Sequence, residues 1–462
     1  MRSIFKFTCM PIVAVLTFSS SIQAAEIEEV IVQGRLLSGA EALVSERMEE
    51  EAVIDVIGAE FISRIGDSTV AAALRRVSGL SLVSGKFIYV RGLGERYSSS
   101  SLNGATIPSP DLTRNVIPLD LFPTSIVESL KVQKSFSADR PASFGGGSVD
   151  IRTKSIPEWL TYSVEFTGGL NSESNGNLLS YSGGDDDAIG TDDGTRSINA
   201  NLVQGIQRFK GNLDAQNVLN TLRTEGDNTS TLSDAQTISR QLALGLNRNI
   251  STRQDDGNPD WGVRASIGNN FILTDEWEAG FLFGGSYGTK WRQTNAIARN
   301  FRFPTERFEV ESETTQSFDL NTNLNLGIRY TDDHELSSTS LFIRNTDDEV
   351  AVIDLFNENR ELSDGRGFRN ERIKFEERNM IVNQVKATHR LGEATRELLQ
   401  HVPLVSSLPI NRIPEGLQFD WYYSEARAFT DIPNEVNVSS ETVTNLVSGG
   451  VESASVSMDS AA

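Results

Sequence analysis

A run of strict alternation between apolar and polar residues constrains the fold more than any other feature of the sequence. It covers the stretch FDLNTNLNLGIRY, from Phe318 to Tyr330. Its apolar side consists of Phe318, Leu320, Leu324, Leu326, Ile328 and Tyr330, and its polar side of Asp319, Asn321, Asn323, Asn325 and Arg329. Successive side chains of a strand point to opposite faces, so this period of two predicts a strand with one apolar and one polar face. Ordinary strands have about 5–6 residues, whereas a tilted strand needs about 9–11 residues to cross a membrane. The length of the run therefore favours a transmembrane strand.

Similar segments recur on both sides of this run. The stretches YSVEFTGG, WGVRASIGNNF, WEAGFLFGGSYG and QFDWYYSEA show the same alternation. Aromatic residues near strand ends fit the aromatic girdles of a membrane barrel, and these are Trp261, Trp277, Trp291, Tyr330 and Trp421. We predict antiparallel transmembrane β-barrel strands over residues 158–430, in preference to a soluble β-sandwich.

The N-terminal segment has the pattern of a secretory signal peptide. Arg2 and Lys6 precede an apolar stretch from Met10 to Phe18, and small residues lead to Ala24. We therefore predict a signal peptide over residues 1–24. The single Cys of the chain, Cys9, lies within it, so the mature chain offers neither disulfides nor thiolate metal ligands.

The balance of charge narrows the class of partner. The chain has 42 Lys and Arg against 63 Asp and Glu, which gives a formal net charge of −21. A phosphate-binding surface needs clustered Lys and Arg, so nucleic-acid binding is disfavoured. After the signal peptide, no apolar run is long enough for a membrane helix. That observation does not exclude a β-barrel, because barrel strands alternate in polarity and contain no long apolar run.

Residues 53–157 read as a compact domain of mixed helices and strands. The stretch VIDVIGAEFISRIG predicts a strand followed by a short helix. A second helix is predicted to begin at a cap on Asp67 or Ser68 and to end before Gly79. The stretches SLVSG, KFIYVRG, ESLKVQKS and GSVDIRTKS predict short strands, and Asn103-Gly104 predicts a turn.

This domain resembles the plug domain of TonB-dependent outer-membrane receptors. The similarity lies in AAALRRVSGL, VRGLGERY, LNGATIPSPDLTRNVIPLDLFP, IVESLKVQKS and ASFGGGSVDIRTKS, which follow one another in the order of the family. The resemblance implies an N-terminal α+β plug domain followed by a transmembrane β-barrel of about 22 strands in the outer membrane. It implies import of a scarce nutrient without enzymatic activity, cofactor or metal. The alternative is a ligand-binding receptor or adhesin that does not import.

The segment ahead of the plug resembles a TonB box. Within residues 25–52, which we interpret as TonB box and linker, the residues implied to bind TonB are Glu28, Glu29, Val30, Ile31, Val32, Gln33 and Gly34. An extended segment with unpaired backbone groups adds as a strand to an exposed sheet edge, which suits capture by a periplasmic partner. The alternative is an ordinary frayed terminus.

The family layout also implies two further sets of site residues. Those implied to bind the substrate, a chelate or an oligosaccharide, are Ser84, Lys86, Pro108, Ser109, Pro110, Asp111, Thr113 and Arg114. The alternative for the prolines is that they only redirect the chain. Charged residues implied to pair the plug with the barrel are Arg91, Glu95, Arg96, Lys134 and Arg152. The outer-membrane lipid is the remaining implied partner.

Signals for an enzyme or a metal site fail on their context. The sequence GGSYG around Ser286 matches a nucleophile motif, but it lies in an alternating strand and not at a strand–helix turn. The three His residues (His334, His389 and His401) stand apart without ligand spacing. In Asp185–Gly190, Ile189 replaces an oxygen ligand of a calcium loop, so we interpret this segment as a solvated acidic loop. Gly145, Gly146 and Gly147 precede a strand, so they are expected to pack tightly and not to cradle phosphate.

The predicted barrel is incomplete in this chain. We predict about seven strands after Pro157, too few to enclose a plug of this size. Residues 431–462 lack the alternation of a final strand and are expected to be an irregular acidic tail. The expectation is therefore a truncated chain, either a fragment or the product of a frameshifted gene.

Overall fold

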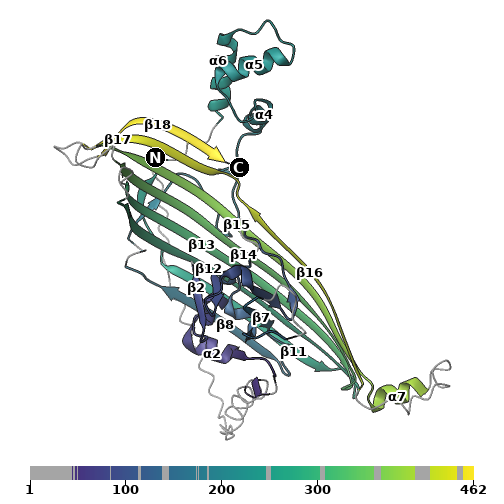
Figure 1. Cartoon of the computed structure of the whole chain (residues 1–462). Coiled ribbons are helices and arrows are strands. Elements are labelled where there is room, and N and C mark those ends of the chain that lie inside the picture. Colours follow the sequence, from purple (N-terminus) through teal and green to yellow (C-terminus); the bar gives the residue numbers. More distant parts are fainter. Residues whose placement is uncertain are drawn as a thin grey trace, which may run out of the picture. The chain divides into compact units, whose positions relative to one another are not determined.

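The chain builds a small mixed domain and a large sheet of long strands in the computed structural model (Figure 1). The structure describes residues 44, 47, 48, 50–83, 85–112, 116–137, 145–172, 174, 176–184, 187–245, 251–301, 307–357, 366–400, 417–444 and 451–461. Contacts divide the chain into residues 1–51 and residues 52–462. The predicted signal peptide and TonB box lie outside the described residues. No described helix is both long enough and apolar enough to cross a membrane.

The mixed domain contains the predicted strand and helix at its start. A five-stranded sheet has the order β1-β6-β7-β4-β5, in which β4 and β7 are parallel and the other pairs antiparallel. Its strands are β1 (Ile54–Gly58), β4 (Ser98–Leu102), β5 (Ala105–Thr106), β6 (Val127–Gln133) and β7 (Gly147–Thr153). A separate hairpin joins β2 (Leu80–Val83) to β3 (Phe87–Val90). The helices are α2 (Ala59–Ile65) and α3 (Val70–Leu74), with the 3₁₀ turns η1 (Glu95–Tyr97), η2 (Leu119–Leu121) and η3 (Thr124–Ile126).

The second helix begins later than predicted. Its N-cap is Thr69, whose hydroxyl accepts a hydrogen bond of 3.3 Å from the Ala72 amide. The prediction of Asp67 or Ser68 as the cap is therefore wrong. The Asp67 carboxylate instead binds both guanidinium nitrogens of Arg76, at 2.8 and 3.0 Å. A bidentate pair of this kind takes up the oxygens that a cap would need.

Glycine allows close packing and a tight turn in this domain. A Cβ atom on Gly146 or Gly147 would lie 2.7 Å from the side chain of Leu93 or Val90, respectively. The expected tight packing of the glycine triplet is thus confirmed. Asn103 and Gly104 both have positive φ, 52° and 83°, and join β4 to β5. Such angles at both central residues are those of a hairpin turn that favours Asn-Gly.

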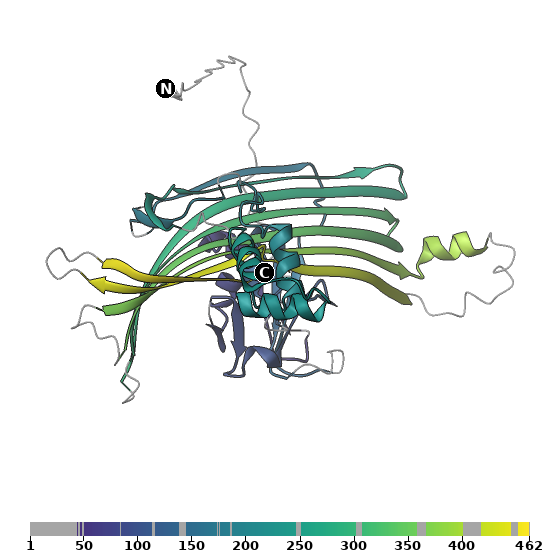
Figure 2. The same cartoon turned by 90° about the horizontal axis from the view of Figure 1, so that it is seen from above.

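The large sheet has more strands than predicted, and most of them are longer. Nine strands pair antiparallel in the path β18-β17-β15-β14-β13-β12-β11-β8, with β16 also on β15 (Figure 2). They are β8 (Thr161–Gly169), β11 (Asp260–Ile272), β12 (Trp277–Asn300), β13 (Arg307–Tyr330), β14 (His334–Asn357), β15 (Arg366–Arg390), β16 (Gln418–Asp431), β17 (Glu435–Thr444) and β18 (Val451–Ala461). Strands β12 to β14 have 24 residues each and β15 has 25. In the described path, β8 and β18 are edge strands, so the sheet does not close.

Strands β17 and β18 replace the irregular tail that was expected over residues 431–462. Strands β16 and β17 both pair with β15, β16 with Glu377–Arg390 and β17 with Arg366–Lys374. They form one line that is interrupted at residues 432–434, where Pro433 lies. Proline cannot donate to the ladder, which explains the interruption. In β17, Ser and Thr stand at many positions where an apolar residue would continue the alternation, so the period of two is weak in the sequence. The β-branched residues of β17 nevertheless suit a strand.

The polar connection between β8 and β11 contains structure that the sequence analysis did not predict. Strands β9 (Asn177–Ser180) and β10 (Arg253–Asp256) form a separate pair. Between them lie the helices α4 (Ala200–Arg208), α5 (Ala215–Thr224) and α6 (Leu232–Ala243). These helices share a cluster of buried apolar residues around Phe209, Val218 and Leu219. A further helix, α7 (Glu393–Gln400), follows β15.

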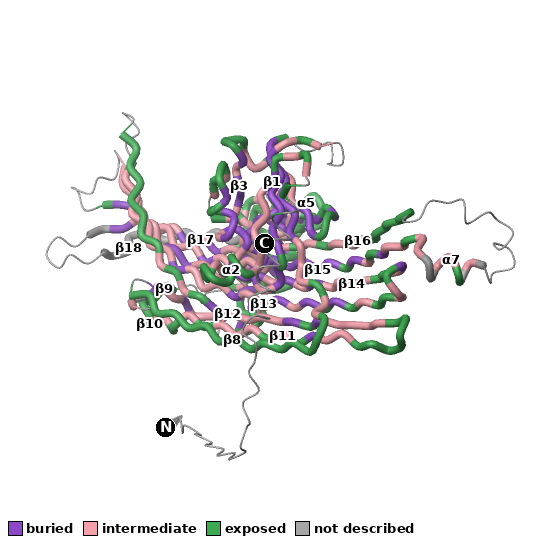
Figure 3. The backbone as a smooth tube through the Cα atoms, turned by 90° about the horizontal axis from the view of Figure 1, so that it is seen from below, coloured by how far each residue is buried: buried purple, intermediate pink, exposed green. Residues whose placement is uncertain are grey.

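Burial alternates along the strands of the large sheet (Figure 3), with apolar side chains exposed on one face and polar side chains buried on the other. On β13, Leu324, Leu326 and Ile328 are 36%, 48% and 38% exposed. The alternating residues Asn321, Asn323 and Asn325 are only 3%, 7% and 4% exposed. We call the side of the Asn residues the plug-facing face and the side of the Leu residues the outer face. An apolar face left bare while polar groups are buried is the arrangement of a sheet whose outer solvent is lipid.

Candidate functional site

The small domain and the plug-facing face of the sheet share one hydrophobic core. Leu341 and Ile343 of β14 belong to it, together with Met380 and Val382 of β15. From the small domain the cluster includes the buried residues Leu102, Ile107, Leu119, Phe122, Leu130, Val132, Val149 and Ile151. A shared apolar cluster fixes the domain against these strands, because separating them would expose it to water.

Four hydrogen bonds reinforce this packing of the small domain against the strands, which we call the seat of the domain. Gln384 of β15 accepts a 2.9 Å bond from the Asn103 amide and donates a 2.9 Å bond to the Leu102 carbonyl. Asn325 of β13 donates to the Lys154 carbonyl at 2.8 Å. The Thr430 hydroxyl of β16 donates to the Pro110 carbonyl. Because three of these bonds use backbone carbonyls, they hold the backbone of the small domain as well as its side chains.

A network of charges lies beside the shared core. The Lys86 Nζ atom lies 3.8 Å from Asp120 of the same domain and 3.8 Å from Asp347 of β14. Arg378 of β15 pairs with Asp347 in turn. Asp319 of β13 accepts a 2.7 Å bond from Asn345 and lies 3.9 Å from the Lys290 ammonium of β12. Lys86 thereby links the small domain electrostatically to the strands.

The Asp120 carboxyl has an unusual environment. Burial raises the pKa of this group above its ordinary value, and Lys86 and Arg378 oppose the rise. Removal of a carboxylate from water disfavours its charged form, so its two cationic neighbours are needed to keep it ionised. Any displacement of the domain from the sheet would therefore weaken the charge contacts that Lys86 makes between Asp120 and Asp347.

Among the residues predicted to pair the plug with the barrel, Lys134 has its partners within the small domain, whereas for Arg91, Glu95, Arg96 and Arg152 the pairing stays a prediction. Lys134 is 7% exposed, and its ammonium binds Asp55 and the Ser78 carbonyl within the small domain. Arg152 lies 3.6 Å from Asp150 on the same strand. Glu95 and Arg96 belong to η1, and Arg91 has a φ of 53°. For Lys134 the expectation of a barrel partner is corrected: the carboxylate nearest to it lies on β1 of its own domain, which the sequence could not show.

The predicted substrate residues are only partly described. Ser84, Thr113 and Arg114 lie outside the described residues. Ser109 donates to the Val116 carbonyl at 2.9 Å and accepts from the Asp111 amide at 3.1 Å. These two bonds fold the described part of the Pro108–Asp111 loop back on itself. Lys86 takes part in the charge network, so its predicted role in binding substrate stays a prediction.

A cavity of about 650 Å³ lies between the small domain and strands β8, β11, β12 and β13. Its lining includes Ser68, Glu165 and Arg264, with Ser286 and Asn321 on the strands. Ser286 lies within β12 and accepts a hydrogen bond of 3.3 Å from Asn321. The GGSYG motif therefore sits inside a strand, as the sequence predicts, and lines a water-accessible gap.

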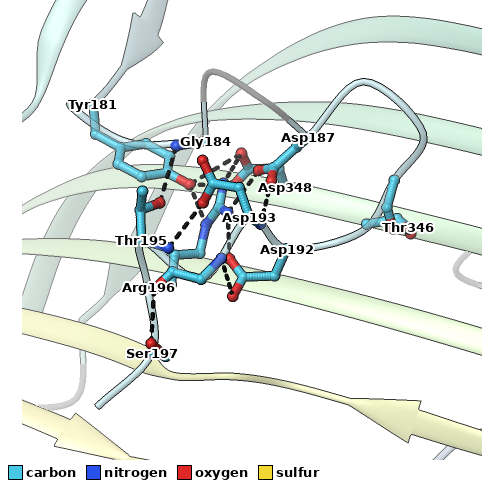
Figure 4. Close-up of polar contacts among 12 residues, drawn as sticks. Tyr181, Gly184, Asp187, Asp192, Asp193, Thr195, Arg196, Ser197, Thr346 and Asp348 are labelled. Carbon is cyan, nitrogen blue, oxygen red and sulfur yellow. Dashed lines mark hydrogen bonds and ion pairs between the residues drawn. The ribbon is translucent and has the colours of Figure 1, made fainter. Parts of the chain in front are cut away.

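On the outer face, one buried arginine organises the connection after β9 (Figure 4). The Arg196 guanidinium is 3% exposed and contacts Asp187 at 2.6 Å, Asp192 at 2.8 Å and Asp348 of β14 at 2.9 Å. Its Nε atom donates to the Tyr181 hydroxyl at 2.5 Å, and it lies 4.4 Å from the centre of the Phe375 ring. The connection is thereby fastened to strands β14 and β15.

The Arg196 cluster also includes acidic residues that lie close enough together to be considered as metal ligands. Carboxylate oxygens of Asp187, Asp192 and Asp193 lie within 4.8 Å of one another. Burial raises the pKa of Asp187, and Arg196 opposes that rise. Since the guanidinium already supplies a positive charge to Asp187 and Asp192, the arrangement is that of an ion-pair cluster. The prediction that Asp185–Gly190 is merely solvated is wrong for its described part, because Asp187 is only 3% exposed.

Comparison with known proteins agrees with this architecture. Residues 46–149 match the family model described as the TonB-dependent Receptor Plug Domain. No curated protein matches the chain in sequence. Among solved structures, the siderophore receptor PirA from Pseudomonas aeruginosa matches at 12% identity, covering 88% of this chain and 57% of that chain, with a TM-score of 0.28.

Two further matches have similar values. The ferric yersiniabactin uptake receptor FyuA from Yersinia pestis matches at 10% identity, 89% and 61% coverage and a TM-score of 0.26. The outer membrane transporter YddB from Escherichia coli matches at 8% identity, 88% and 55% coverage and a TM-score of 0.28. The chain thus spans less than two thirds of the length of each. With TM-scores this low, the assignment depends on the plug match and on the strands themselves.

A small domain packed on the polar face of a sheet whose other face is apolar is the arrangement of a plug and a barrel. Residues 46–149 match the plug domain of TonB-dependent receptors.

Proposed function

We propose that the protein imports a scarce extracellular nutrient across the outer membrane and that TonB supplies the energy through residues 28–34. The observation that carries this proposal is the seat of the plug, which combines a shared core with a small set of polar contacts. Such a seat blocks the path through a barrel at rest. It also contains few strong contacts between the plug and the strands, which are the contacts that a pulling force on the N-terminus would have to break.

The aromatic residues of the outer face support a membrane position. Trp277 stacks near Tyr330, with ring centres 4.8 Å apart, and Trp261 lies 5.2 Å from Tyr287. Trp277 and Tyr287 are ten residues apart on β12. At about 3.4 Å per residue and a tilt of about 35–45°, that separation corresponds to an apolar band about 25 Å tall. We call the level of Trp277 and Tyr330 the inner girdle and that of Trp261 and Tyr287 the outer girdle.

The connections between strands support an orientation. The turns after β11 and β13 contain only residues 273–276 and 331–333, and both lie at the inner girdle, where the longer connection of residues 391–417 between β15 and β16 also lies. The long connection between β8 and β11 lies at the opposite end. Barrels of this class have short periplasmic turns and longer extracellular loops. We therefore place the inner girdle on the periplasmic side, where TonB acts, and the Arg196 cluster on the extracellular side.

The substrate class is a chelate or an oligosaccharide. The cavity beside the plug includes Ser and Asn side chains that could bind the polar groups of either solute. Growth of a deletion strain on single iron sources or single carbon sources separates these two classes.

Deletion of residues 28–34 in cells that produce the protein tests the proposed import. We expect uptake of labelled nutrient to fall to background while surface binding of the same nutrient persists, because the deletion leaves the plug and strands intact. A matched deletion of residues 38–44 in the linker, which removes the same length outside the predicted box, should leave uptake in place. Unchanged uptake without residues 28–34 would contradict import through TonB and favour a receptor or adhesin.

A further inference from the structure

A second cavity, of about 560 Å³, opens on the outer face at the inner girdle. Ile328 and Leu336, which belong to the apolar band, form its apolar part. Trp277 and Tyr330 border it, and so do His334 and His389. The cavity therefore lies where the apolar band meets the polar surface of a membrane.

Rings from neighbouring strands form a row along this cavity. Tyr330 stacks on His334 with ring centres 6.1 Å apart and an interplanar angle of 14°, and His334 lies 5.2 Å from His389. Trp277 extends the row on β12 and Trp421 on β16. The expectation that the His residues stand apart is wrong for this pair, because the β14–β15 register places His334 opposite His389.

A directed chain of hydrogen bonds fixes the state of both imidazoles. Trp421 donates its indole N–H to His389 Nε2 at 3.2 Å, and the two Nδ1 atoms lie 3.1 Å apart. His334 Nε2 lies 3.0 Å from the Thr395 hydroxyl, which donates to Asp333 at 2.6 Å. Indole only donates, so His389 must carry its proton on Nδ1 and His334 must carry its proton on Nε2. Every ring nitrogen of the pair thus has a hydrogen-bond partner.

The cavity has unbalanced negative charge. Glu276 and Glu335 both line it. Neither carboxylate takes part in an ion pair within the described part of the chain. Of the two, Glu276 lies beside Tyr330 and next to Trp277, whereas Glu335 lies opposite Arg329 on the other face of the sheet. A carboxylate beside aromatic rings is the combination that attracts an ammonium group, through charge and through cation–π contact.

We propose that this cavity binds a phospholipid with a primary ammonium headgroup from the periplasmic leaflet. The ammonium lies between Glu276 and the aromatic rings, and the acyl chains extend along Ile328 and Leu336. A lipid is the occupant because the cavity is continuous with the exposed apolar band, which only acyl chains cover in a membrane. This site rests on the membrane orientation proposed above but not on import.

The test uses the purified full chain in detergent with phosphatidylethanolamine or phosphatidylglycerol added at equal concentration. Native mass spectrometry counts the lipid adducts. We expect roughly two- to fivefold more adduct with phosphatidylethanolamine, the factor that one exposed cation–π contact supplies. The double variant E276Q/E335Q should lose this preference. Both side chains are exposed, so the substitutions leave the packing of the sheet unchanged.

The neighbouring carboxylates Asp275 and Asp332 provide a matched control. They lie in the turns of residues 273–276 and 331–333, one and three positions before Glu276 and Glu335, but do not line the cavity. The variant D275N/D332N has the same change of net charge and should keep the preference. Equal adducts with both lipids in the unsubstituted chain would overturn the proposal, as would a preference that survives E276Q/E335Q or disappears in D275N/D332N. Failure of import after deletion of residues 28–34 has no bearing on this result, because that deletion leaves the cavity intact.

Discussion

Arg196 shows how much of the outer face depends on one residue. Its guanidinium is the shared partner of three carboxylates, one of which, Asp348, is 152 positions further along the chain. The sequence predicted an acidic loop at this place but gave no indication of the arginine. Neither the distance in sequence nor the composition of the loop shows that Asp348 and Phe375 meet at one point on neighbouring strands.

Replacing Arg196 by Met tests this role. Two buried carboxylates, Asp187 and Asp348, would lose their partner, and breaking a buried ion pair costs about 3–5 kcal/mol. We expect residues 181–197 to detach from β14 and β15. A protease that cuts after acidic residues should then cleave at Asp187, Asp192 and Asp193 much faster than in the unsubstituted chain.

Arg208→Met serves as the matched control. Arg208 pairs with Glu225 at 2.6 Å, but both side chains are largely exposed. Exposed pairs contribute little, so the cleavage pattern of residues 181–197 should stay the same. Equal protection in the Arg196 and Arg208 variants would show that the connection is held by other contacts.

At the scale of elements, the sequence predicted the strands whose alternation is strong. The two faces of β13 were predicted correctly, because an exposed apolar face and a buried polar face impose a period of two. Strand β17 was missed since Ser and Thr blur that period. The helices α4 to α6 were missed because they bury only a small cluster within a polar connection. Likewise the plug contacts of Lys134 depend on β1–β6 pairing, which no local pattern shows.

Leu326→Arg on β13 tests the outer face as a lipid-facing surface. Leu326 lies about midway between the two girdles, where an Arg costs about 2–4 kcal/mol. We expect a marked fall in the fraction of the chain that floats with phospholipid vesicles in a density gradient.

Val310→Arg on the same strand is its control. Val310 has the same parity on β13 but lies beyond the outer girdle, since Leu320 is already opposite Tyr287. An arginine beyond the band costs about 0–1 kcal/mol, so flotation should hardly change. Equal losses in both variants would show that the outer face does not meet lipid at the proposed depth.

For the whole molecule, the open sheet sets the limit of stability. The edges of β8 and β18 present unpaired backbone groups, and in lipid each such group costs several kcal/mol. The outer face can still associate with lipid. We expect that residues 1–462 alone form no stable, heat-resistant species in the outer membrane, whereas residues 45–157 alone are soluble.

Gels run with unheated and heated membrane extracts check this expectation. A closed barrel migrates differently before and after heating and resists protease. A heat-modifiable, protease-resistant band from the 462-residue chain would show that the strands close. Aggregation of residues 45–157 would show that the plug needs the Leu341 and Met380 side of its core to stay folded.

The length of the strands has a consequence for what reaches the protein from outside. On β12, 13 residues continue past Tyr287 to Asn300. At about 3.3 Å each and with the tilt of a barrel strand, they rise roughly 30 Å above the apolar band. In the orientation proposed above, the rim formed by these strand ends would lie well outside the apolar band, so a large particle approaching from outside would contact the rim before the band.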